Sequence, residues 1–244
     1  MLDHVTVRVA DLTASERFYR ITLGALGIEP TQTGEDWIAW GDFLIAAADG
    51  EHPPTRHLHV GFVAPSRDHV DEFWRAGIDA GHQDDGPPGE RPQYTPGYYG
   101  AFLRDPDGNS AEAVRHDFVR DGGHIDHLWI RVRDLDATSA FYAALMRHAG
   151  LREGRRWADG RQFRGACATF SLVADDAPAT EHLHLAFPAP DRQTVKDFHR
   201  AAMSAGYRDA GPPGERPQLQ PGSYAASVLD PNGTNVESVC RERR

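Results

Sequence analysis

Apolar and polar positions alternate at the start of the chain and then change their period. Across residues 4–9, valines would line one face of a strand, while His, Thr and Arg would line the other. A Thr13-x-x-Glu16 pattern, which is typical of a capping box, then predicts a helix. Apolar runs at 37–40 and 43–47 predict two short strands after that helix.

The same order of elements follows in the next part of the chain. Residues 59–63 predict a strand, and residues 66–80 predict a helix that ends at Gly81. A loop is expected over 86–97, followed by a hairpin of 98–104 and 110–114 around an Asp-Pro-Asp-Gly-Asn turn, which reads as turn chemistry only.

The second half of the chain repeats the first. Residues 3–19 and 126–142 are identical at nine of seventeen positions, and the sequence GPPGERPQ at 86–93 recurs letter for letter at 211–218. We therefore interpret the chain as a tandem duplication with a join at 118–123 and two domains, 1–118 and 124–244.

A weaker repeat lies within each half. His4 precedes Phe18 by fourteen residues, and His59, His127 and His184 each precede a phenylalanine by the same spacing. This predicts four related βαβββ modules, two in each half. The mixed order of strands and helices, with few βαβ crossovers, indicates an α+β fold.

Composition narrows the classes of function. The 244 residues carry a formal net charge of −10, which argues against nucleic-acid and anionic-membrane partners. No apolar run approaches the length of a membrane span, and the N-terminus lacks the regions of a signal peptide. The two cysteines, Cys167 and Cys240, form no motif and are expected to be buried thiols, so we expect a cytoplasmic protein.

Histidines and glutamates at repeated positions are the strongest candidates for chemistry. Two imidazoles and one carboxylate can bind a divalent metal and leave coordination positions open for a substrate. The alternative is that duplication has merely retained polar residues at strand edges. The six candidate metal ligands are His4, His59, Glu112, His127, His184 and Glu237.

These motifs, in this order, resemble the vicinal oxygen chelate superfamily of glyoxalases, fosfomycin and bleomycin resistance proteins, and extradiol dioxygenases. The resemblance rests on Asp3-His4-Val5, on His59-Val-Gly-Phe62, on Asp105 to Glu112, and on their counterparts in the second half. It implies paired βαβββ modules that form a cup around a divalent metal, which chelates two neighbouring oxygens of a substrate.

The chain departs from the better-known members of that superfamily. Glyoxalase I-like sites use a carboxylate late in the odd modules, but residues 43–48 and 169–173 contain none. Extradiol dioxygenases carry a tyrosine ten residues before the glutamate, where this chain has Phe102 and Ser227. Both assignments are thereby weakened, whereas bleomycin-sequestering members lack the metal ligands that this chain has twice.

Several other residues could contribute to a site. His57 and His182 each lie two residues before a candidate ligand, so they would share its strand face as acid/base groups, unless they are solvated strand ends. Tyr99 and Tyr224 are further catalytic candidates, being the tyrosines nearest to the expected position. On the repeated loop, Arg91 and Arg216 could bind an anionic substrate, or they could be structural residues. Glu90 and Glu215 on the same loop are candidate bases.

We therefore expect a metal-dependent enzyme, a lyase or isomerase or else a dioxygenase, acting on a small oxygenated metabolite. Fe(II) suits the ligand set, with Zn, Mn and Ni as rivals. The alternative is a protein that sequesters an antibiotic or metabolite without turnover. The expected partner is a small molecule, and the chain would be a monomer or a homodimer.

Two pairings of the modules are open. Within each half, His4 would join His59 and Glu112; in the crossed form, His4 would join His184 and Glu237. We favour the crossed form, because exchanging an identical element is an easy route to a dimer that a short join could later fuse.

Overall fold

The computed structural model describes residues 2–117, 122–165, 168–216 and 222–241. Cys167 and most of the join between the halves lie outside these residues, whereas Cys240 is a buried free thiol. No helix in the described parts of the chain is long and apolar enough to span a membrane.

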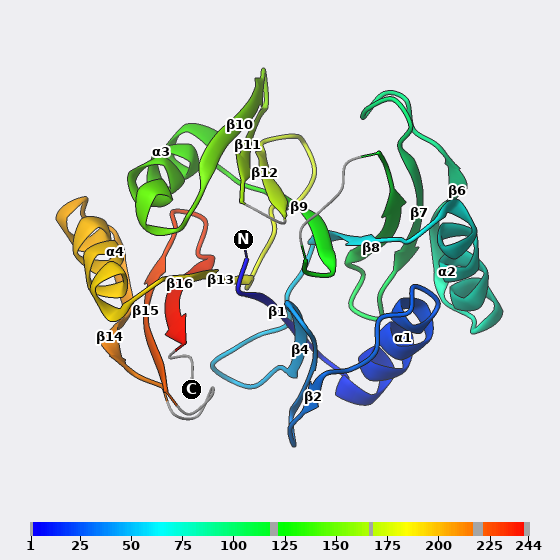
Figure 1. Ribbon diagram of the computed structural model, residues 1–244, viewed down its shortest axis with the longest axis horizontal. Helices are drawn as coiled ribbons and strands as arrows, with labels where there is room; N and C mark the ends of the chain where they lie inside the picture. Colours follow the sequence, from blue (N-terminus) through cyan, green and yellow to red (C-terminus); the bar gives the residue numbers. More distant parts are fainter. Residues whose placement is uncertain (1, 118–121, 166–167, 217–221, 242–244) are drawn as a thin grey trace.

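Each half contains two modules with the predicted element order (Figure 1). The first half comprises β1 (His4–Val9), α1 (Leu12–Gly24), β2 (Gln32–Thr33), β3 (Trp37–Trp40), β4 (Phe43–Ala47), β5 (His59–Val63), α2 (Arg67–Asp79), β6 (Gln83–Glu90), β7 (Tyr99–Arg104) and β8 (Ser110–Arg115). The second half comprises β9 (Ile125–Arg131), α3 (Leu135–Leu145), the short 3₁₀ helix η1 (Met146–His148), β10 (Arg152–Trp157), β11 (Gly160–Arg164), β12 (Thr169–Val173), β13 (His184–Pro188), α4 (Arg192–Ser204), β14 (Arg208–Glu215), β15 (Ser223–Leu229) and β16 (Asn235–Arg241).

The strands form two eight-stranded sheets, and each sheet takes one module from either half. The β1 sheet has the order β14-β15-β16-β13-β1-β4-β3-β2, and the β5 sheet has the order β10-β11-β12-β9-β5-β8-β7-β6. The modules join through antiparallel pairs of their first strands, β1 with β13 and β5 with β9. The α+β fold of four βαβββ modules is thus confirmed, and the modules pair in the crossed arrangement. The division into domains 1–118 and 124–244 stays a prediction.

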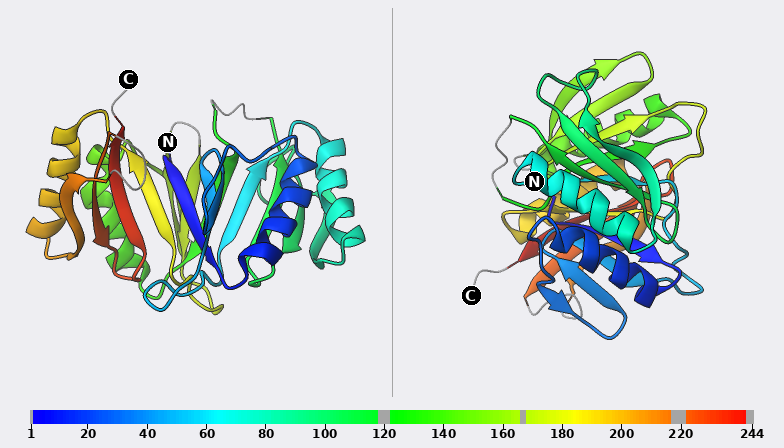
Figure 2. Two further views of the ribbon diagram at one scale, coloured as in Figure 1. Left: turned by 90° about the horizontal axis from the view of Figure 1, so that it is seen from below. Right: turned by 90° about the vertical axis from the view of Figure 1, so that its right-hand side faces the viewer.

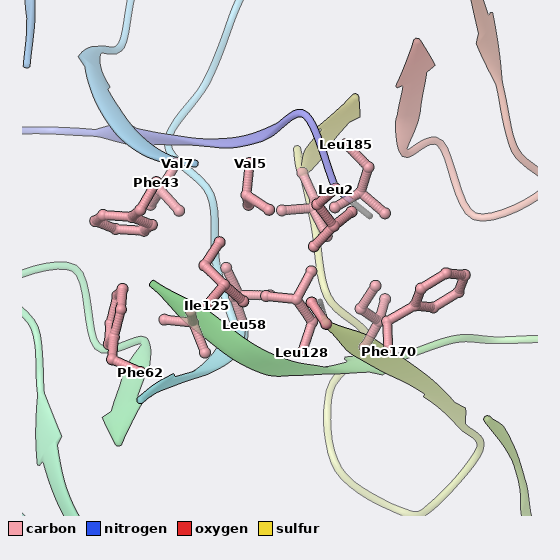
Figure 3. Packing of buried hydrophobic residues seen from close by; sticks show 14 of the residues in the cluster. Leu2, Val5, Val7, Phe43, Leu58, Phe62, Ile125, Leu128, Phe170 and Leu185 are labelled. Carbon is pink, nitrogen blue, oxygen red and sulfur yellow. The ribbon is translucent and has the colours of Figure 1, made fainter. Parts of the chain in front are cut away.

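The two sheets pack back to back, with the helices between them at either end. Helix α1 contacts α2, and α3 contacts α4 (Figure 2). In the middle, Val5 and Leu185 of the β1 sheet lie opposite Ile125 and Leu128 of the β5 sheet (Figure 3). The helix-free faces of the sheets therefore point outward, away from each other.

The N-cap of helix α1 lies two residues before the predicted capping box. Asp11, in an extended conformation, is the N-cap, and its carboxylate accepts the N–H of Ala14. Glu16 instead forms an ion pair with Arg20 one turn later. The capping-box assignment to Thr13 was wrong, because Asp11 caps the helix and Thr13 lies within its first turn.

The repeated Gly-Pro-Pro segment belongs to a strand and not to the predicted loop at 86–97. Strand β6 lies at the edge of the β5 sheet, and its pairing with β7 shifts register near Gly86 and Gly89. Prolines are tolerated there because an edge strand has a row of N–H groups that need no partner. The same arrangement recurs in β14 at the edge of the β1 sheet.

The Asp-Pro-Asp-Gly-Asn turn does more than reverse the chain. Asp105 is buried, accepts the backbone N–H of Asn109 and receives the hydroxyl of Tyr19 at 3.0 Å. The side chain of Asn109 accepts the N–H of Leu58 at 3.0 Å and donates to the carbonyl of Thr55. The turn thereby fixes the segment that leads into His59 at the start of β5.

Candidate metal centres

The six candidate ligands gather in two groups of three. His4, His184 and Glu237 form the His4 centre, on the β1 sheet, and within it the candidate ligand atoms all lie within 4.8 Å of one another. The same holds for His59, Glu112 and His127, which form the His59 centre on the β5 sheet. Each centre combines residues from both halves.

Strand register places the three side chains of the His59 centre on the helix-free face. His59 is the first residue of β5, while Glu112 and His127 both pair with Gly61, two residues further along that strand. A Cβ atom at Gly61 would collide with the imidazole of His127. A glycine at this position therefore allows His127 to lean toward Glu112.

The candidate ligand atoms of the His59 centre converge closely. His59 Nε2 lies 3.0 Å from Glu112 Oε2 and 3.1 Å from His127 Nε2, which is itself 3.3 Å from the same oxygen. The other ring nitrogens are engaged elsewhere, since His127 Nδ1 donates to Asp126 at 2.9 Å and His59 Nδ1 bonds the hydroxyl of Ser110 at 3.0 Å. When the imidazole of His127 is neutral, its Nε2 lone pair thus faces a carboxylate oxygen.

The electrostatics of this centre call for a positive charge. Burial alone would lower the pKa of His127, but hydrogen bonds to Asp126 and Glu112 outweigh it and raise the pKa to about 10. Burial would raise the pKa of Glu112, yet its bonds to His127 and His59 bring that pKa to about 2. Burial lowers the pKa of His59. In the metal-free chain a proton supplies the charge, and a divalent cation would meet the same need.

The sequence reasoning missed Tyr98. Its hydroxyl donates to Glu112 Oε1 at 2.6 Å, so only the other carboxylate oxygen faces the histidines. Phe102 pairs directly with Glu112, and counting back from it in steps of two along β7 reaches Gly100 and Tyr98. The alternation of the strand could therefore have identified this residue.

The predicted tyrosines point to the opposite face. Tyr99 donates its hydroxyl to Asp71 on helix α2 at 2.8 Å, and the ring of Tyr224 lies 5.1 Å from the guanidinium of Arg192 on α4. Both side chains thus lie on the helix-covered faces of their sheets. The structure therefore places them one strand position away from the faces that carry the candidate ligands.

A buried carboxylate extends the His59 centre behind His127. Asp126 bridges His127 and His116, whose Nε2 donates to its second oxygen at 2.7 Å. Both Asp126 and His116 are buried. Such a carboxylate holds the imidazole in one orientation and increases its basicity toward a metal. His116 follows Glu112 by four residues, but no motif in the sequence singled it out.

The His4 centre has the same ligands in looser contact. His184 Nε2 lies 2.9 Å from Glu237 Oε2, but it is buried and makes no hydrogen bond to the described residues. His4 Nδ1 donates to Asp3 at 2.8 Å, and Asp3 in turn pairs with Arg241. Burial lowers the pKa of His184. An orphaned ring nitrogen beside a carboxylate fits a metal ligand.

His57 and His182 do not share the strand face of the ligands that follow them. Both adopt left-handed backbone conformations, with φ of 59° and 56°, and both side chains are exposed. Their carbonyls accept hydrogen bonds from the hydroxyls of Thr180 and Thr55, respectively, across the two halves. The inference from strand alternation was wrong because the strands begin only at His59 and His184.

Arg91 and Arg216 fold back on their own segments. Arg91 donates to the carbonyl of Pro87 at 2.8 Å, and Arg216 makes the same bond to Pro212. The guanidinium of Arg91 also lies 5.5 Å from the ring of Phe102. These contacts favour the structural interpretation over the substrate clamp. The neighbouring carboxylates are engaged too, because Glu90 pairs with Arg67 and Glu215 with Arg192.

Comparison with known proteins agrees with this geometry. The sequence model of the Glyoxalase/Bleomycin resistance protein/Dioxygenase superfamily matches residues 1–113 and 124–238. Glyoxalase I from Zea mays has a similar structure, with a TM-score of 0.68 at 17% identity over 98% of this chain and 92% of that chain. A protein of Bacillus subtilis subsp. subtilis str. 168, described provisionally as a dioxygenase, also gives a TM-score of 0.68 at 17% identity, over 99% of this chain and 85% of that one. No curated protein sequence matches the chain. The family model covers most of both halves, and the chain belongs to the Glyoxalase/Bleomycin resistance protein/Dioxygenase superfamily.

Proposed function

We propose that the chain is a metal-dependent enzyme that binds two neighbouring oxygens of a small oxygenated substrate. The observation that carries this proposal is the convergence of His59 Nε2, His127 Nε2 and Glu112 Oε2, all within 3.3 Å of one another. Three lone-pair donors at this separation repel one another unless a cation or a proton lies between them. Two imidazoles and one carboxylate leave coordination positions free.

A divalent metal is the group that these residues would hold. Fe(II) is our first choice for two histidines and one carboxylate, followed by Zn, Mn and Ni. When bound, the metal would act as a Lewis acid toward the substrate oxygens and stabilise the negative charge that develops on them. The His4 centre offers the same donor set to a second ion.

The surrounding residues hold the ligands of the His59 centre in place. Asp126 and Ser110 fix the two imidazoles through their Nδ1 atoms, so each Nε2 points to the centre. Tyr98 engages one oxygen of Glu112 and leaves the other for the metal. One carboxylate oxygen and two nitrogens then occupy one side, and the remaining side stays available to substrate.

Two reaction classes suit this arrangement, a lyase or isomerase reaction and a dioxygenase reaction. The full-length structural neighbours named above include a glyoxalase I and a provisional dioxygenase, one from each class. We propose a metal-dependent enzyme of either class. The identity of the bound metal distinguishes the two, because a reaction with O₂ requires a redox-active ion.

Metal analysis of the purified full-length chain tests the proposal. After stripping with a chelator and reloading, the chain should hold about two equivalents of divalent metal. Glu112→Gln should remove about one equivalent, because a neutral amide is a poor replacement for a carboxylate. Glu90→Gln, which breaks only an exposed ion pair with Arg67, is the matched control and should retain both.

Turnover separates the enzyme from a sequestering protein. Removal of the metal should abolish conversion of a substrate found by screening oxygenated metabolites, and reloading should restore it. Full metal retention in both Glu112→Gln and Glu237→Gln would overturn the ligand assignment. A best ligand that binds equally well without metal and is never converted would favour sequestration.

A further inference from the structure

Equivalent segments on the two outward faces carry opposite charge. Residues 151–173, which contain β10 to β12, hold five arginines and only two carboxylates. The equivalent residues 28–47, which contain β2 to β4, hold four carboxylates and no lysine or arginine. In a chain with a net charge of −10, a cationic hairpin at one edge of the β5 sheet is a local exception.

Two of these arginines share the face that carries the His59 centre. Strand register places Arg152 opposite Arg164, Arg164 opposite Thr169, and Thr169 beside His127. With strands about 4.8 Å apart, the backbone of Arg164 lies roughly 10 Å from that of His127. The two arginines are thus in the same row of the sheet as a candidate metal ligand.

The charge of this arginine pair is not neutralised by any of the residues that the structure describes. Like charges directly opposite each other on a sheet are destabilising. Among the described residues no carboxylate forms an ion pair with Arg152 or Arg164, and Arg164 donates only to the amide oxygen of Gln162 at 3.0 Å. An exposed cationic pair of this kind is suited to an external anion, which a guanidinium binds in bidentate fashion.

An indole pair lies on the same face, beside the His59 centre. Trp129 is directly opposite His59 in the β5–β9 pair, and Trp157 stacks on it with ring centroids 5.8 Å apart and planes at 28°. A Cβ atom at Gly160 would collide with the indole of Trp157, so the glycine lets this ring lie flat on the strand. Both indoles are partly exposed.

The β1 sheet lacks this combination. Thr6 takes the place of Trp129, opposite His184, and it pairs with Leu44 on the neighbouring strand. Trp37 lies against Gly34 as Trp157 lies against Gly160, but without a second indole within stacking distance among the described residues. Among the described residues, a stacked indole pair beside two facing arginines thus occurs on the β5 sheet and has no counterpart on the β1 sheet, where Arg8 is the arginine in the row of Trp37.

We propose that the helix-free face of the β5 sheet binds a planar, conjugated anion. Its flat ring would lie on the Trp129–Trp157 pair, and its anionic group would bind Arg152 and Arg164. Across the sheet, Arg164 lies roughly 10 Å and Arg152 roughly 14 Å from His127. That this anion is a substrate rests on the proposed function, whereas its binding does not. Binding of the anion needs the indoles and the guanidinium groups, and it can be measured without turnover.

Calorimetric titration with 2-naphthoate tests the binding. The full-length chain loaded with Zn²⁺ should bind one molecule of 2-naphthoate. Its neutral amide and its saturated decahydro analogue should each bind roughly tenfold more weakly, because one lacks the charge and the other the planar ring. Equal affinity for all three compounds, or binding of none of them, would overturn the proposal.

Paired variants locate the ligand. Trp129→Thr, which copies Thr6, and Arg164→Gln should each weaken binding of 2-naphthoate about five- to tenfold, while Trp129→Phe should retain most of it. The matched controls are Trp37→Leu on the β1 sheet and Arg156→Gln, whose side chain already pairs with Glu153. Both controls should bind like the wild type, and a loss in the controls equal to that in the test variants would contradict the assignment.

Metal content is measured on the same samples to separate the two proposals. If Zn²⁺ binds and 2-naphthoate does not, the anion site is refuted and the proposed function is unaffected. If 2-naphthoate binds through Trp129 and Arg164 but no metal binds, the anion site is supported and the metal-dependent function is refuted.

Discussion

The His59 and His4 centres have identical ligands and different supports. Tyr98 donates to Glu112, whereas the hydroxyl of the equivalent Ser223 is buried and has no hydrogen-bond partner among the described residues. Gly61 makes room for His127, and the equivalent position beside His4 is Ala186. Duplication has thus kept the candidate metal ligands and changed the residues that hold them.

The residue behind the aspartate that bonds each histidine also differs. Asp126 receives a hydrogen bond from His116, whereas Asp3 pairs with the permanently charged Arg241. Each aspartate bonds the Nδ1 atom of its neighbouring histidine, at 2.9 Å for His127 and 2.8 Å for His4. The comparison teaches that equal ligand sets do not imply equal metal affinity, because the supporting residues set the geometry and basicity of the ligands.

The largest expected effect comes from double substitutions that test the pairing of the centres. His4→Ala with Glu237→Ala should damage one centre and leave about one metal equivalent. His4→Ala with Glu112→Ala should damage both centres and leave almost none. Metal analysis of the two proteins measures this contrast. A chain with His4→Ala and Glu112→Ala that still holds one full equivalent would contradict the crossed pairing.

Gly61→Ala should convert the geometry of the His59 centre toward that of the His4 centre. The added methyl group would collide with the ring of His127 and push it from Glu112. We expect Zn²⁺ affinity at this centre to fall about 10- to 100-fold, and stability to fall by about 1–3 kcal/mol. Competition with a chromophoric chelator measures the affinity, and urea unfolding measures the stability. The reciprocal Ala186→Gly should leave Zn²⁺ affinity at the His59 centre unchanged.

Tyr98→Phe should weaken the His59 centre by a smaller amount. Glu112 Oε1 would lose its donor and become free to rotate, so Zn²⁺ affinity should fall roughly tenfold. Tyr99→Phe is the matched control, because the hydroxyl of Tyr99 bonds Asp71 on the helix-covered face. If the two variants bind Zn²⁺ equally well, Tyr98 does not support the centre.

The last expected effect concerns the pH dependence of stability at the buried turn of the second half. Burial raises the pKa of Asp230 to about 6, and Tyr142 lies 3.4 Å from its carboxylate, against 3.0 Å for Tyr19 and Asp105. A carboxyl group whose pKa is higher in the folded than in the unfolded chain binds its proton more tightly when folded. Its contribution to stability is therefore largest below pH 4 and is lost as the pH rises through 6.

Asp230→Asn removes this dependence. In urea unfolding of the metal-free chain, the stability of the variant relative to the wild type should rise between pH 4 and pH 8 by on the order of 2 kcal/mol. A constant difference across this range would show that Asp230 titrates normally.

Repetition in the sequence explains why the fold and the grouping of the candidate ligands could be predicted. Four histidines at matching distances from a phenylalanine mark four modules, and the two Glu residues follow in register. The supports of the centres were harder to predict. Tyr98 lies just before the first residue of β7. The sheet face on which its side chain lies therefore cannot be predicted without knowing where the strand begins.

Backbone conformation accounts for the remaining differences. His57 and His182 adopt positive φ values, which are uncommon outside glycine and which strand alternation cannot predict. The sequence of the Gly-Pro-Pro segments predicts loops, because proline and glycine have low strand propensity. An edge strand nevertheless tolerates them, since its outer N–H groups need no partner in the sheet. Both cases depend on neighbours that are distant in sequence, such as Thr180 for His57.

The crossed pairing has a consequence for the order of assembly during translation. The β5 sheet and its centre are built from residues 59–173, a continuous stretch in the middle of the chain. The β1 sheet joins the first strand to the last, so His4 must wait for Glu237 to leave the ribosome. The β5 sheet is thus able to form during translation, while the N-terminal module still lacks the C-terminal module with which it pairs.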